Sequence, residues 1–284
     1  FCRIKAFLDI PDDDRKMHKM PVPRYGGIPF VVTLTAVVLF LFQFSSEYLW
    51  FYLSLTVIGL LGFIDDLITL SWRTKLLVQF FVGSYIFYLI SLVVPTMQFF
   101  LFQFHLPVYL MYGVFMLWFF GILNAVNLVD GMDGLAGGMV FVMFIGFSFL
   151  GWITGNLLFL TFSVMVMACL YAFLVFNARP AKFFMGDMGS LFLGFLLAVA
   201  PILFFFTSKS QAVLDITPFL VFCSYLILDT FRVFYHRVKQ KKNPLKPDRS
   251  HFHHQLLDKT GSYNATLFYI YFFIALFILF GMVL

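Results

Sequence analysis

The chain has 284 residues, of which 62% are hydrophobic, 21% aromatic and only 12% charged. A soluble domain is about half apolar and about one quarter charged, so this composition excludes an ordinary water-soluble protein and predicts that lipid covers much of the surface. The net charge is +5, but the basic residues flank apolar segments, which favours membrane headgroups over nucleic acid as their partners.

Apolar segments long enough to cross a bilayer follow one another along the chain. A spanning helix needs roughly 17 to 25 mainly apolar residues. Such segments stand at 28–44, 49–64, 76–95, 107–123, 135–153, 157–176, 190–206, 213–232 and 264–284. They lack the alternating polarity of barrel strands, and only closed hydrogen bonding survives in lipid. We therefore predict an all-α integral membrane fold, a polytopic bundle of about nine or ten transmembrane helices.

The basic residues lie almost entirely on one side of this predicted bundle. When the loops are assigned alternately to the two sides, all of the 19 Lys and Arg residues except Lys209 fall on the same side. The positive-inside rule places that side in the cytoplasm. Its longest segment is 233–263, and no linker or repeat divides the chain. Residues 1–284 are therefore interpreted as a single transmembrane domain.

Acidic residues gather in three segments on this side. Asp65 and Asp66 stand where the second span ends, Asp130 and Asp133 follow the fourth span, and Asp187 precedes the seventh. Each one alone is compatible with a solvated helix end or an N-cap. Adjacent carboxylates repel each other, however, and ionisable groups near a membrane are costly and usually functional. A divalent cation or a cationic substrate would relieve the repulsion.

Asn127 extends this acidic set. Asn127, Asp130 and Asp133 are spaced by three, which places them along one side of a helix. Gly131 and Gly134 between them let the backbone approach a ligand or a neighbouring helix closely. Packing of small residues accounts for the glycines but not for both aspartates.

Three of the six histidines stand together near the end of the longest segment. His251, His253 and His254 follow Arg249, and no cysteine is placed to complete a zinc site with them. Phosphate binding by imidazole, Arg249 and the nearby lysines fits the pattern better. A solvated basic loop explains the lysines but not the gathering of histidines.

Carboxylates beside cationic and imidazole groups suit phosphoryl transfer. Mg²⁺ prefers oxygen ligands and often binds through one or two carboxylates plus substrate phosphates, while positive groups neutralise phosphate charge. From the residues alone we predict a metal-dependent phosphotransferase that acts on a lipid at the cytoplasmic face. One rival is a transporter, which would hold its polar residues near the membrane midplane. Another is a lipid-binding scaffold, which does not need five acids on one face.

The motifs, in this order, resemble the polyprenyl-phosphate N-acetylhexosamine-1-phosphate transferase family over nearly the whole chain. The matching segments are 9–11, 15–18, 21–27, 65–66, 124–134, 186–190 and 247–254. The family includes the initiating enzymes of enterobacterial-antigen and teichoic-acid synthesis and the related phospho-MurNAc-pentapeptide translocase. The resemblance implies one or two more spans than are visible here. The stretch before Asp9 is interpreted as the tail of a helix that begins outside this sequence.

The resemblance also implies a reaction. N-acetylhexosamine-1-phosphate, with GlcNAc-1-phosphate favoured, passes from a UDP-sugar to undecaprenyl phosphate, releasing UMP and starting a lipid-linked cell-surface glycan such as lipopolysaccharide or teichoic acid. Mg²⁺ is the implied cofactor, and Mn²⁺ is a possible substitute. The implied partners are UDP-N-acetylhexosamine, undecaprenyl phosphate and the lipid bilayer, with no nucleic acid; a homodimer stays open. The implied location is the bacterial inner membrane, with the catalytic face in the cytoplasm.

Residue roles follow from motif position within this resemblance. Asp65 and Asp66 are implied as catalytic, acting as base or lipid-phosphate partner, and Asp187 as the principal Mg²⁺ ligand with Asp66 beside it. His251 and His253 are implied to act at the phosphates. The implied substrate-binding residues are Lys19, Lys75, Asn127, Asp130, Asp133, Phe184, Arg249 and His254. Among them, Phe184 is placed to stack on uracil.

Two features qualify the resemblance. Some relatives carry a third acid where Thr69 stands here, so a role that needs a third carboxylate lacks its residue. Segments 15–18 and 247–254 look more like the hexosamine-phosphate branch than the pentapeptide branch, which remains the alternative. The sequence leaves open whether attack is direct or passes through an aspartyl-phosphate.

Overall fold

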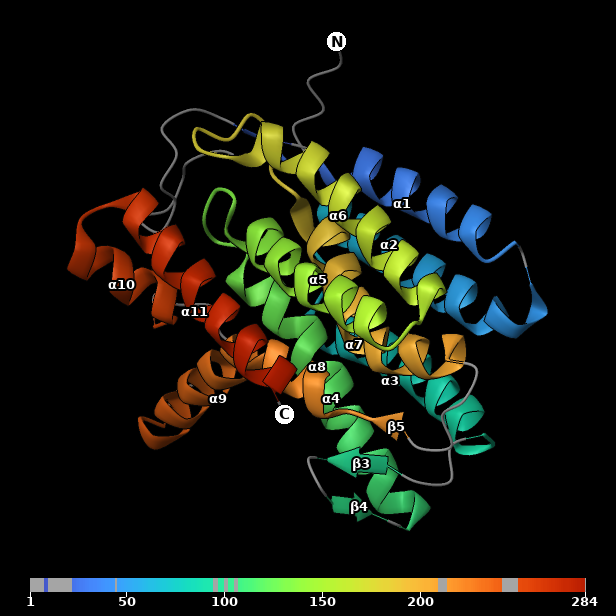
Figure 1. Cartoon of the computed structure of the whole chain (residues 1–284). Coiled ribbons are helices and arrows are strands. Elements are labelled where there is room, and N and C mark those ends of the chain that lie inside the picture. Colours follow the sequence, from blue (N-terminus) through green and yellow to red (C-terminus); the bar gives the residue numbers. More distant parts are fainter. Residues whose placement is uncertain are drawn as a thin grey trace.

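The computed structural model describes residues 8–9, 22–43, 45–93, 97–99, 102–104, 107–208, 214–241 and 250–283. Within these ranges the chain forms a bundle of helices with two small sheets outside it (Figure 1). The all-α prediction is confirmed, because seven of the described helices are long and apolar enough to cross a membrane. The protein is therefore a multi-pass membrane protein.

The seven spans correspond to segments predicted from hydropathy. They are α2 (Leu49–Ile68), α3 (Trp72–Ser91), α4 (Val108–Val129), α5 (Leu135–Ile153), α6 (Leu157–Asn177), α7 (Gly186–Thr207) and α11 (Tyr263–Val283). A short 3-10 turn at Ser46–Tyr48 leads directly into α2. Helix α1 (Gly27–Leu41) is equally apolar but shorter, with 15 residues.

Helix α7 lies at the centre of the bundle. Every residue from Gly189 to Phe205 is buried. A helix that is apolar all round is stable in the interior, where every face meets other side chains. Helices α2 and α4 pack along it, and α1 contacts it as well (Figure 1). Whatever stands at the first turn of α7 is therefore surrounded by the ends of its neighbours.

A glycine allows α2 to approach the start of α7 closely. A Cβ atom at Gly62 would lie 2.5 Å from the Cα of Met188 and 2.6 Å from the carbonyl oxygen of Asp187. Because both are backbone atoms, no side-chain rearrangement could relieve this clash. The contact brings the last turn of α2, with Asp65 and Asp66, against the first turn of α7. The glycine before the acidic pair thus has a packing reason.

The structure corrects the prediction of a single span at 213–232. Two helices occupy this segment, α8 (Thr217–Phe222) and α9 (Ser224–Lys239), and the chain turns between them at Cys223. The physical reason lies in the second half, which is amphipathic: α9 exposes Leu228 and Phe231 but buries Asp229. A charged residue fixed to one helix face does not suit a helix surrounded by lipid.

The predicted loop at 233–263 also contains regular structure. Helix α9 continues to Lys239, and α10 (Phe252–Thr260) follows before α11 begins. The histidines predicted to lie in a loop therefore stand at the first turn of a helix. In Figure 1, α10 lies at the left edge of the bundle beside α11, and α9 lies below them; both contact α11.

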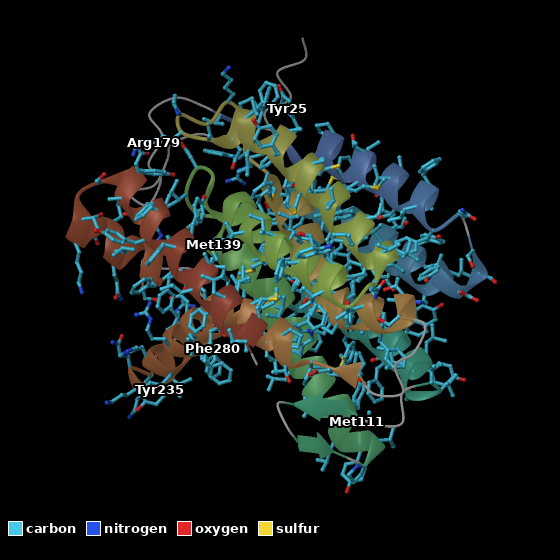
Figure 2. The ribbon with its side chains drawn as sticks, viewed as in Figure 1. Tyr25, Met111, Met139, Arg179, Tyr235 and Phe280 are labelled. Atoms are coloured by element: carbon cyan, nitrogen blue, oxygen red, sulfur yellow. The ribbon has the colours of Figure 1, made fainter. Side chains whose placement is uncertain are left out.

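Two small sheets were not expected from the sequence. Strand β1 (Leu8–Asp9) pairs antiparallel with β2 (Val22–Pro23), aligning Leu8 with Pro23. Strand β3 (Met97–Phe99) pairs antiparallel with β4 (Phe102–Phe104) and parallel with β5 (Leu214–Asp215). Figure 2 shows Tyr25 and Arg179 at one end of the bundle and Met111, close to the second sheet, at the other.

Candidate active site

Asp66 caps the first turn of α7. Its Oδ1 accepts a hydrogen bond from the backbone N–H of Asp187 at 2.8 Å, and its Oδ2 accepts one from Met188 at 2.9 Å. The residue before them, Gly186, has φ +70°, and a Cβ there would lie 2.7 Å from the Asp66 carboxylate. Glycine is needed here for both conformation and space. Asp66 therefore fixes where α7 starts.

Asp65 is buried and points to different partners. Its Oδ2 accepts a hydrogen bond from Lys75 Nζ at 2.7 Å, and its Oδ1 accepts one from the backbone N–H of Leu70 at 2.6 Å. Its carboxylate also lies within hydrogen-bond reach of the Asp187 carboxylate. Lys75, predicted to contact a substrate phosphate, is thus an ion-pair partner of Asp65.

Asn127 holds Asp187 in place from α4. Its Nδ2 donates to Asp187 Oδ1 at 2.6 Å and to Ser190 Oγ at 2.9 Å. Ser190 is fully buried in α7. Both N–H groups of the amide are therefore directed at α7, and its Oδ1 is left as an acceptor. The prediction that Asn127, Asp130 and Asp133 lie along one side of a helix is wrong, because α4 ends at Val129 and the chain then turns towards α5; only Asn127 is helical.

Asp130 follows α4 and faces the same cluster. Burial and the negative charges of Asp187 and Asp66 raise the pKa of Asp130 to about 7, while Arg24 opposes the effect. Arg24 also acts electrostatically on Asp66, so it lies near both carboxylates. Asp65, Asp66, Asp130 and Asp187 are called the acidic cluster below. Sequence reasoning quoted Arg24 within a motif but missed it as a site residue.

Asp133 stands at the edge of this site. Its Oδ2 accepts a hydrogen bond from the backbone N–H of Ala181 at 3.2 Å, and its carbonyl oxygen accepts one from the Tyr263 hydroxyl at 3.2 Å. The guanidinium of Arg179 lies over the Tyr263 ring at 4.1 Å. Asp133 therefore joins the α4–α5 turn to the α6–α7 loop and to the start of α11.

The histidines form a second cluster, anchored on α9. Asp229 Oδ2 lies 2.8 Å from His251 Nδ1, while Asp229 Oδ1 accepts hydrogen bonds from Phe252 N–H at 2.8 Å and from Arg232 at 3.0 Å. The His251 and His253 rings stack with centroids 5.7 Å apart, and those of His253 and His254 are 4.2 Å apart. These three histidines with Asp229 and Arg232 are called the histidine cluster.

The electrostatics of the histidine cluster favour neutral imidazole at His253. Burial and the neighbouring histidines lower the pKa of His253 to about 3. Although burial raises the pKa of Asp229, hydrogen bonds from His251 and Arg232 hold it below its usual value. Among the described residues, His251 Nε2 and both ring nitrogens of His253 are buried without a hydrogen-bond partner. Buried polar atoms of this kind need a partner, which a ligand can supply.

The two clusters meet at Gly131, in the turn after α4. A Cβ there would lie 3.5 Å from His253 Nε2 and 3.9 Å from His254 Nε2. Asp130 is its chain neighbour, so the His253 and His254 rings lie against the same turn that carries Asp130. The arrangement joins groups that attract cations to groups that can contact anions.

The residues fit a magnesium ion. No group of three or more acidic, histidine or cysteine side chains in the described part of the chain makes a ready metal cage. Mg²⁺ usually binds through one or two carboxylates and completes its shell with water and substrate phosphates. Asp187 and Asp65 meet this description, since their carboxylates lie together and would otherwise repel. Asp66 fits less well, because both its oxygens accept backbone hydrogen bonds.

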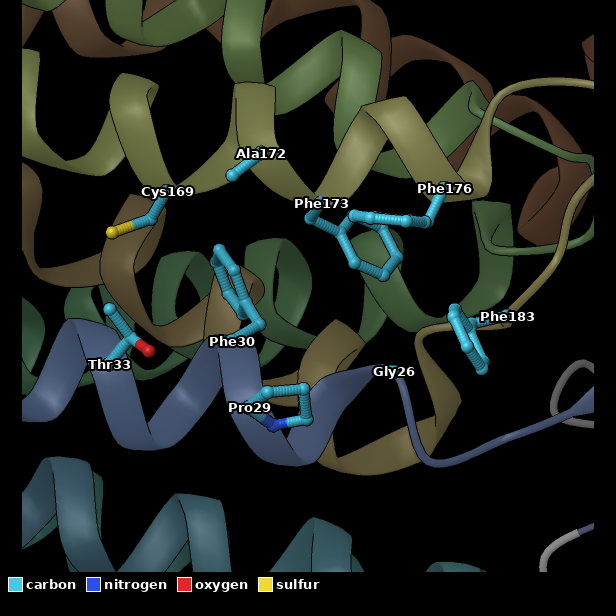
Figure 3. A pocket seen from close by; sticks show the side chains of 9 residues that line it. All are labelled: Gly26, Pro29, Phe30, Thr33, Cys169, Ala172, Phe173, Phe176 and Phe183. Atoms are coloured by element: carbon cyan, nitrogen blue, oxygen red, sulfur yellow. The ribbon is translucent and has the colours of Figure 1, made fainter.

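An apolar pocket of about 280 Å³ lies between α1 and α6 (Figure 3). It is lined by Gly26, Pro29, Phe30, Thr33, Cys169, Ala172, Phe173, Phe176 and Phe183. Its rim adjoins the start of α7, because Gly26 N–H donates to the carbonyl oxygen of Phe184 at 3.0 Å. No carboxylate or imidazole lines it, so it does not form part of the polar site.

The structure thus brings together most of the predicted site residues that it describes. Lys19 and Arg249 lie outside the described residues. Phe184 stands on the loop directly before α7, half-buried, with its backbone N–H bonded to Pro23 at 2.8 Å. Asp229 and Arg232 were not predicted as site residues. The signal was present, since Asp229 is an acid within an apolar segment.

Comparison with known proteins gives consistent matches. The family model described as Glycosyl transferase family 4 matches residues 48–205. A Bacillus subtilis (strain 168) protein, "Probable undecaprenyl-phosphate N-acetylglucosaminyl 1-phosphate transferase", is 32% identical over 270 residues, which cover 93% of this chain and 73% of the relative. The Thermotoga maritima undecaprenyl-phosphate alpha-N-acetylglucosaminyl 1-phosphate transferase is 34% identical over 267 residues, which cover 94% of this chain and 78% of the relative. The phospho-N-acetylmuramoyl-pentapeptide-transferase of Staphylococcus carnosus is 34% identical over 224 residues, or 71% and 68%.

Proposed function

Because this chain belongs to glycosyl transferase family 4, we propose that it transfers N-acetylhexosamine-1-phosphate from a UDP-sugar to undecaprenyl phosphate. In this reaction an oxygen of the lipid phosphate attacks the sugar-bearing phosphorus. The bond between the two phosphates of the nucleotide sugar breaks, and UMP leaves. The products are a lipid pyrophosphoryl sugar and UMP.

The observation that carries the proposal is the meeting of the two clusters at Gly131. The turn next to Gly131 carries Asp130, one of the carboxylates that repel one another, and buried imidazole nitrogens that lack partners among the described residues lie against that turn. A metal-bound diphosphate beside the acceptor phosphate satisfies both halves, because the cation neutralises carboxylates and phosphate groups hydrogen-bond to imidazole nitrogens. A transporter or a lipid-binding scaffold needs neither half in this arrangement.

Asp187 and Asp65 would hold the Mg²⁺ in this proposal. When bound, the ion supplies charge neutralisation for the phosphates and for the leaving nucleotide. Asn127 orients Asp187 through its 2.6 Å hydrogen bond, and Asp66 fixes the first turn of α7. Mn²⁺ is the expected substitute, since it also takes oxygen ligands.

The remaining site residues bind and orient the substrates. Lys75 is paired with Asp65 at 2.7 Å. When the acceptor phosphate binds, Lys75 is placed to contact that phosphate. His251 and His253 contact phosphate oxygens through their buried nitrogens, together with Arg249. Phe184, before α7, stacks on the uracil.

GlcNAc is the favoured sugar. The two relatives named for N-acetylglucosaminyl 1-phosphate transfer match 93% and 94% of this chain, against 71% for the S. carnosus pentapeptide transferase. The excess of basic residues on one side supports a site on the cytoplasmic face of a bacterial inner membrane. Phospho-MurNAc-pentapeptide transfer is the alternative within the same family.

The test is UMP release by purified protein from UDP-GlcNAc, with undecaprenyl phosphate and Mg²⁺ each present or omitted. Release that requires both supports the proposal. Release only from UDP-MurNAc-pentapeptide would replace the sugar and keep the reaction class. No release from any UDP-sugar would overturn the proposal and favour a transporter or scaffold.

A further inference from the structure

Asp229 lies outside both the acidic cluster and the motif that contains the histidines. It stands on α9, is 4% exposed, and reaches the histidine turn from 22 residues earlier in the chain. Its two oxygens accept from three donors: the His251 ring, the Phe252 backbone and the Arg232 guanidinium. An isolated carboxylate is costly to bury, so this degree of pairing explains how α9 can carry it.

The hydrogen bond to Asp229 sets the tautomer of His251. A carboxylate accepts but does not donate, so His251 Nδ1 must carry the proton that it shares with Asp229 at 2.8 Å. The neutral ring then presents Nε2 as a lone pair. That Nε2 is buried and has no hydrogen-bond partner among the described residues. Asp229 thus determines which nitrogen of the neutral ring carries the proton and which is left as an unpartnered lone pair.

Arg232 makes the arrangement rigid. The same terminal nitrogen donates to Asp229 Oδ1 at 3.0 Å and to the carbonyl oxygen of Ser250 at 2.6 Å. Asp229 in turn binds the N–H of Phe252 at 2.8 Å. The residues on both sides of His251 are therefore tied to α9, and the ring has little freedom to rotate away. A catalytic group held by such supports reacts in a fixed geometry.

We propose that Asp229 is a positioning residue, which with Arg232 fixes His251 so that Nε2 is aimed at the phosphates of the substrates. The inference rests on the proposed function for the identity of those phosphates. In its neutral state His251 Nε2 takes the proton of the acceptor phosphate monoanion as that phosphate attacks, the adjacent Asp229 carboxylate stabilises the imidazolium, and the proton then passes to the phosphate of the departing UMP. The logic is that of an aspartate that orients a catalytic histidine without being protonated itself.

The experiment is a double-mutant cycle on the full chain in lipid nanodiscs. We expect Asp229→Asn to lower kcat by roughly 10²- to 10³-fold, with KM for UDP-GlcNAc changed by less than about twofold. In a His251→Ala background the same substitution should cost less than about threefold, because Asp229 acts through the ring. Asp229→Glu, which keeps the charge, should recover part of kcat and serves if the Asn variant does not fold.

Asp215→Asn is the matched control. Asp215 caps α8 by accepting from Thr217 N–H at 2.9 Å, and it has no contact with the histidines among the described residues. Its kcat should equal that of the unmodified chain. A kcat for Asp229→Asn within twofold of the unmodified chain, or a full penalty retained in the His251→Ala background, would overturn the positioning role.

A second measurement separates this inference from the proposed function. ¹⁵N NMR of histidine-labelled protein, without any substrate, should show His251 with its proton on Nδ1, and a mixture of tautomers in Asp229→Asn. That result with no UMP release would reject the transferase and keep the positioning role. A His251 protonated on Nε2 alone would reject the positioning role whatever the activity.

Discussion

The acidic cluster and the histidine cluster are built in different ways. The acidic cluster is assembled from the ends of spanning helices, with Asp66 bonded to α7 across 121 residues of sequence. Its carboxylates face each other, and Lys75 and Arg24 supply only part of the opposing charge. The histidine cluster is formed by α9 and α10 at the edge of the bundle, and it contains its own ion pair, Asp229 and Arg232.

This difference indicates a division of labour. Rigid spans hold a set of carboxylates that is incomplete without a cation. The peripheral helices α9 and α10 hold the imidazoles beside an ion pair of their own, Asp229 and Arg232. These imidazoles still have buried nitrogens without partners among the described residues. Metal dependence should therefore follow the acidic cluster, whereas phosphate handling should follow the histidine cluster. Variants can test whether the two properties separate.

The largest effect is expected from Asp187→Asn. The substitution removes the carboxylate that Asn127 orients at 2.6 Å, so transfer should fall by at least about 10³-fold. UMP release across a Mg²⁺ titration measures it, with size-exclusion chromatography to confirm folding. Turnover near that of the unmodified protein at saturating Mg²⁺ would remove Asp187 from the metal site.

His253→Ala tests the other side of the comparison. Loss of the buried ring that faces Gly131 should lower kcat by roughly 10²-fold. The Mg²⁺ concentration for half-maximal rate should stay unchanged, because no carboxylate is altered. A kcat equal to that of the unmodified protein would show that the ring has only a structural role. A shifted Mg²⁺ concentration for half-maximal rate would show that both clusters take part in metal binding.

Acidification should destabilise the histidine cluster first. His253 has its pKa lowered from 6.5 to about 3, so above pH 6.5 the ring is neutral in both folded and unfolded chains. As pH falls below 6.5 only the unfolded chain gains the proton, and stability falls by about 1.4 kcal/mol per pH unit. Melting curves at pH 7 and pH 5 should show this loss in the unmodified protein and a smaller one in His253→Asn. Equal losses would contradict it.

The smallest effect is expected from Asp66→Asn. The amide keeps one acceptor for the first turn of α7 and loses the other, which should cost about 1 to 2 kcal/mol of stability. Activity should fall with the stability, while the Mg²⁺ midpoint stays within about twofold of the unmodified value. A large shift of that midpoint would make Asp66 a metal ligand, as the resemblance first implied, rather than a cap.

Much of the site was predictable because its polar residues stand out from the sequence immediately around them. An acid pair at the end of an apolar segment, or three histidines after a basic stretch, stands out against a chain that is only 12% charged. Their placement at one end of the bundle followed from counting spans. The roles of Asp66 and Lys75 did not follow, since both depend on partners that the sequence does not place beside them.

The sequence by itself determined that lipid is the solvent, where most of the spanning helices lie, and that the charged residues gather at one end of the bundle. Each of these depends on the run of apolar residues and on charge counts, which are local properties in a lipid environment. The tertiary structure decided the break at Cys223, the cap of Asp66 on α7 and the hydrogen bond between Asp229 and His251. These depend on packing between distant segments, where a close approach at Gly62 decides which polar groups meet.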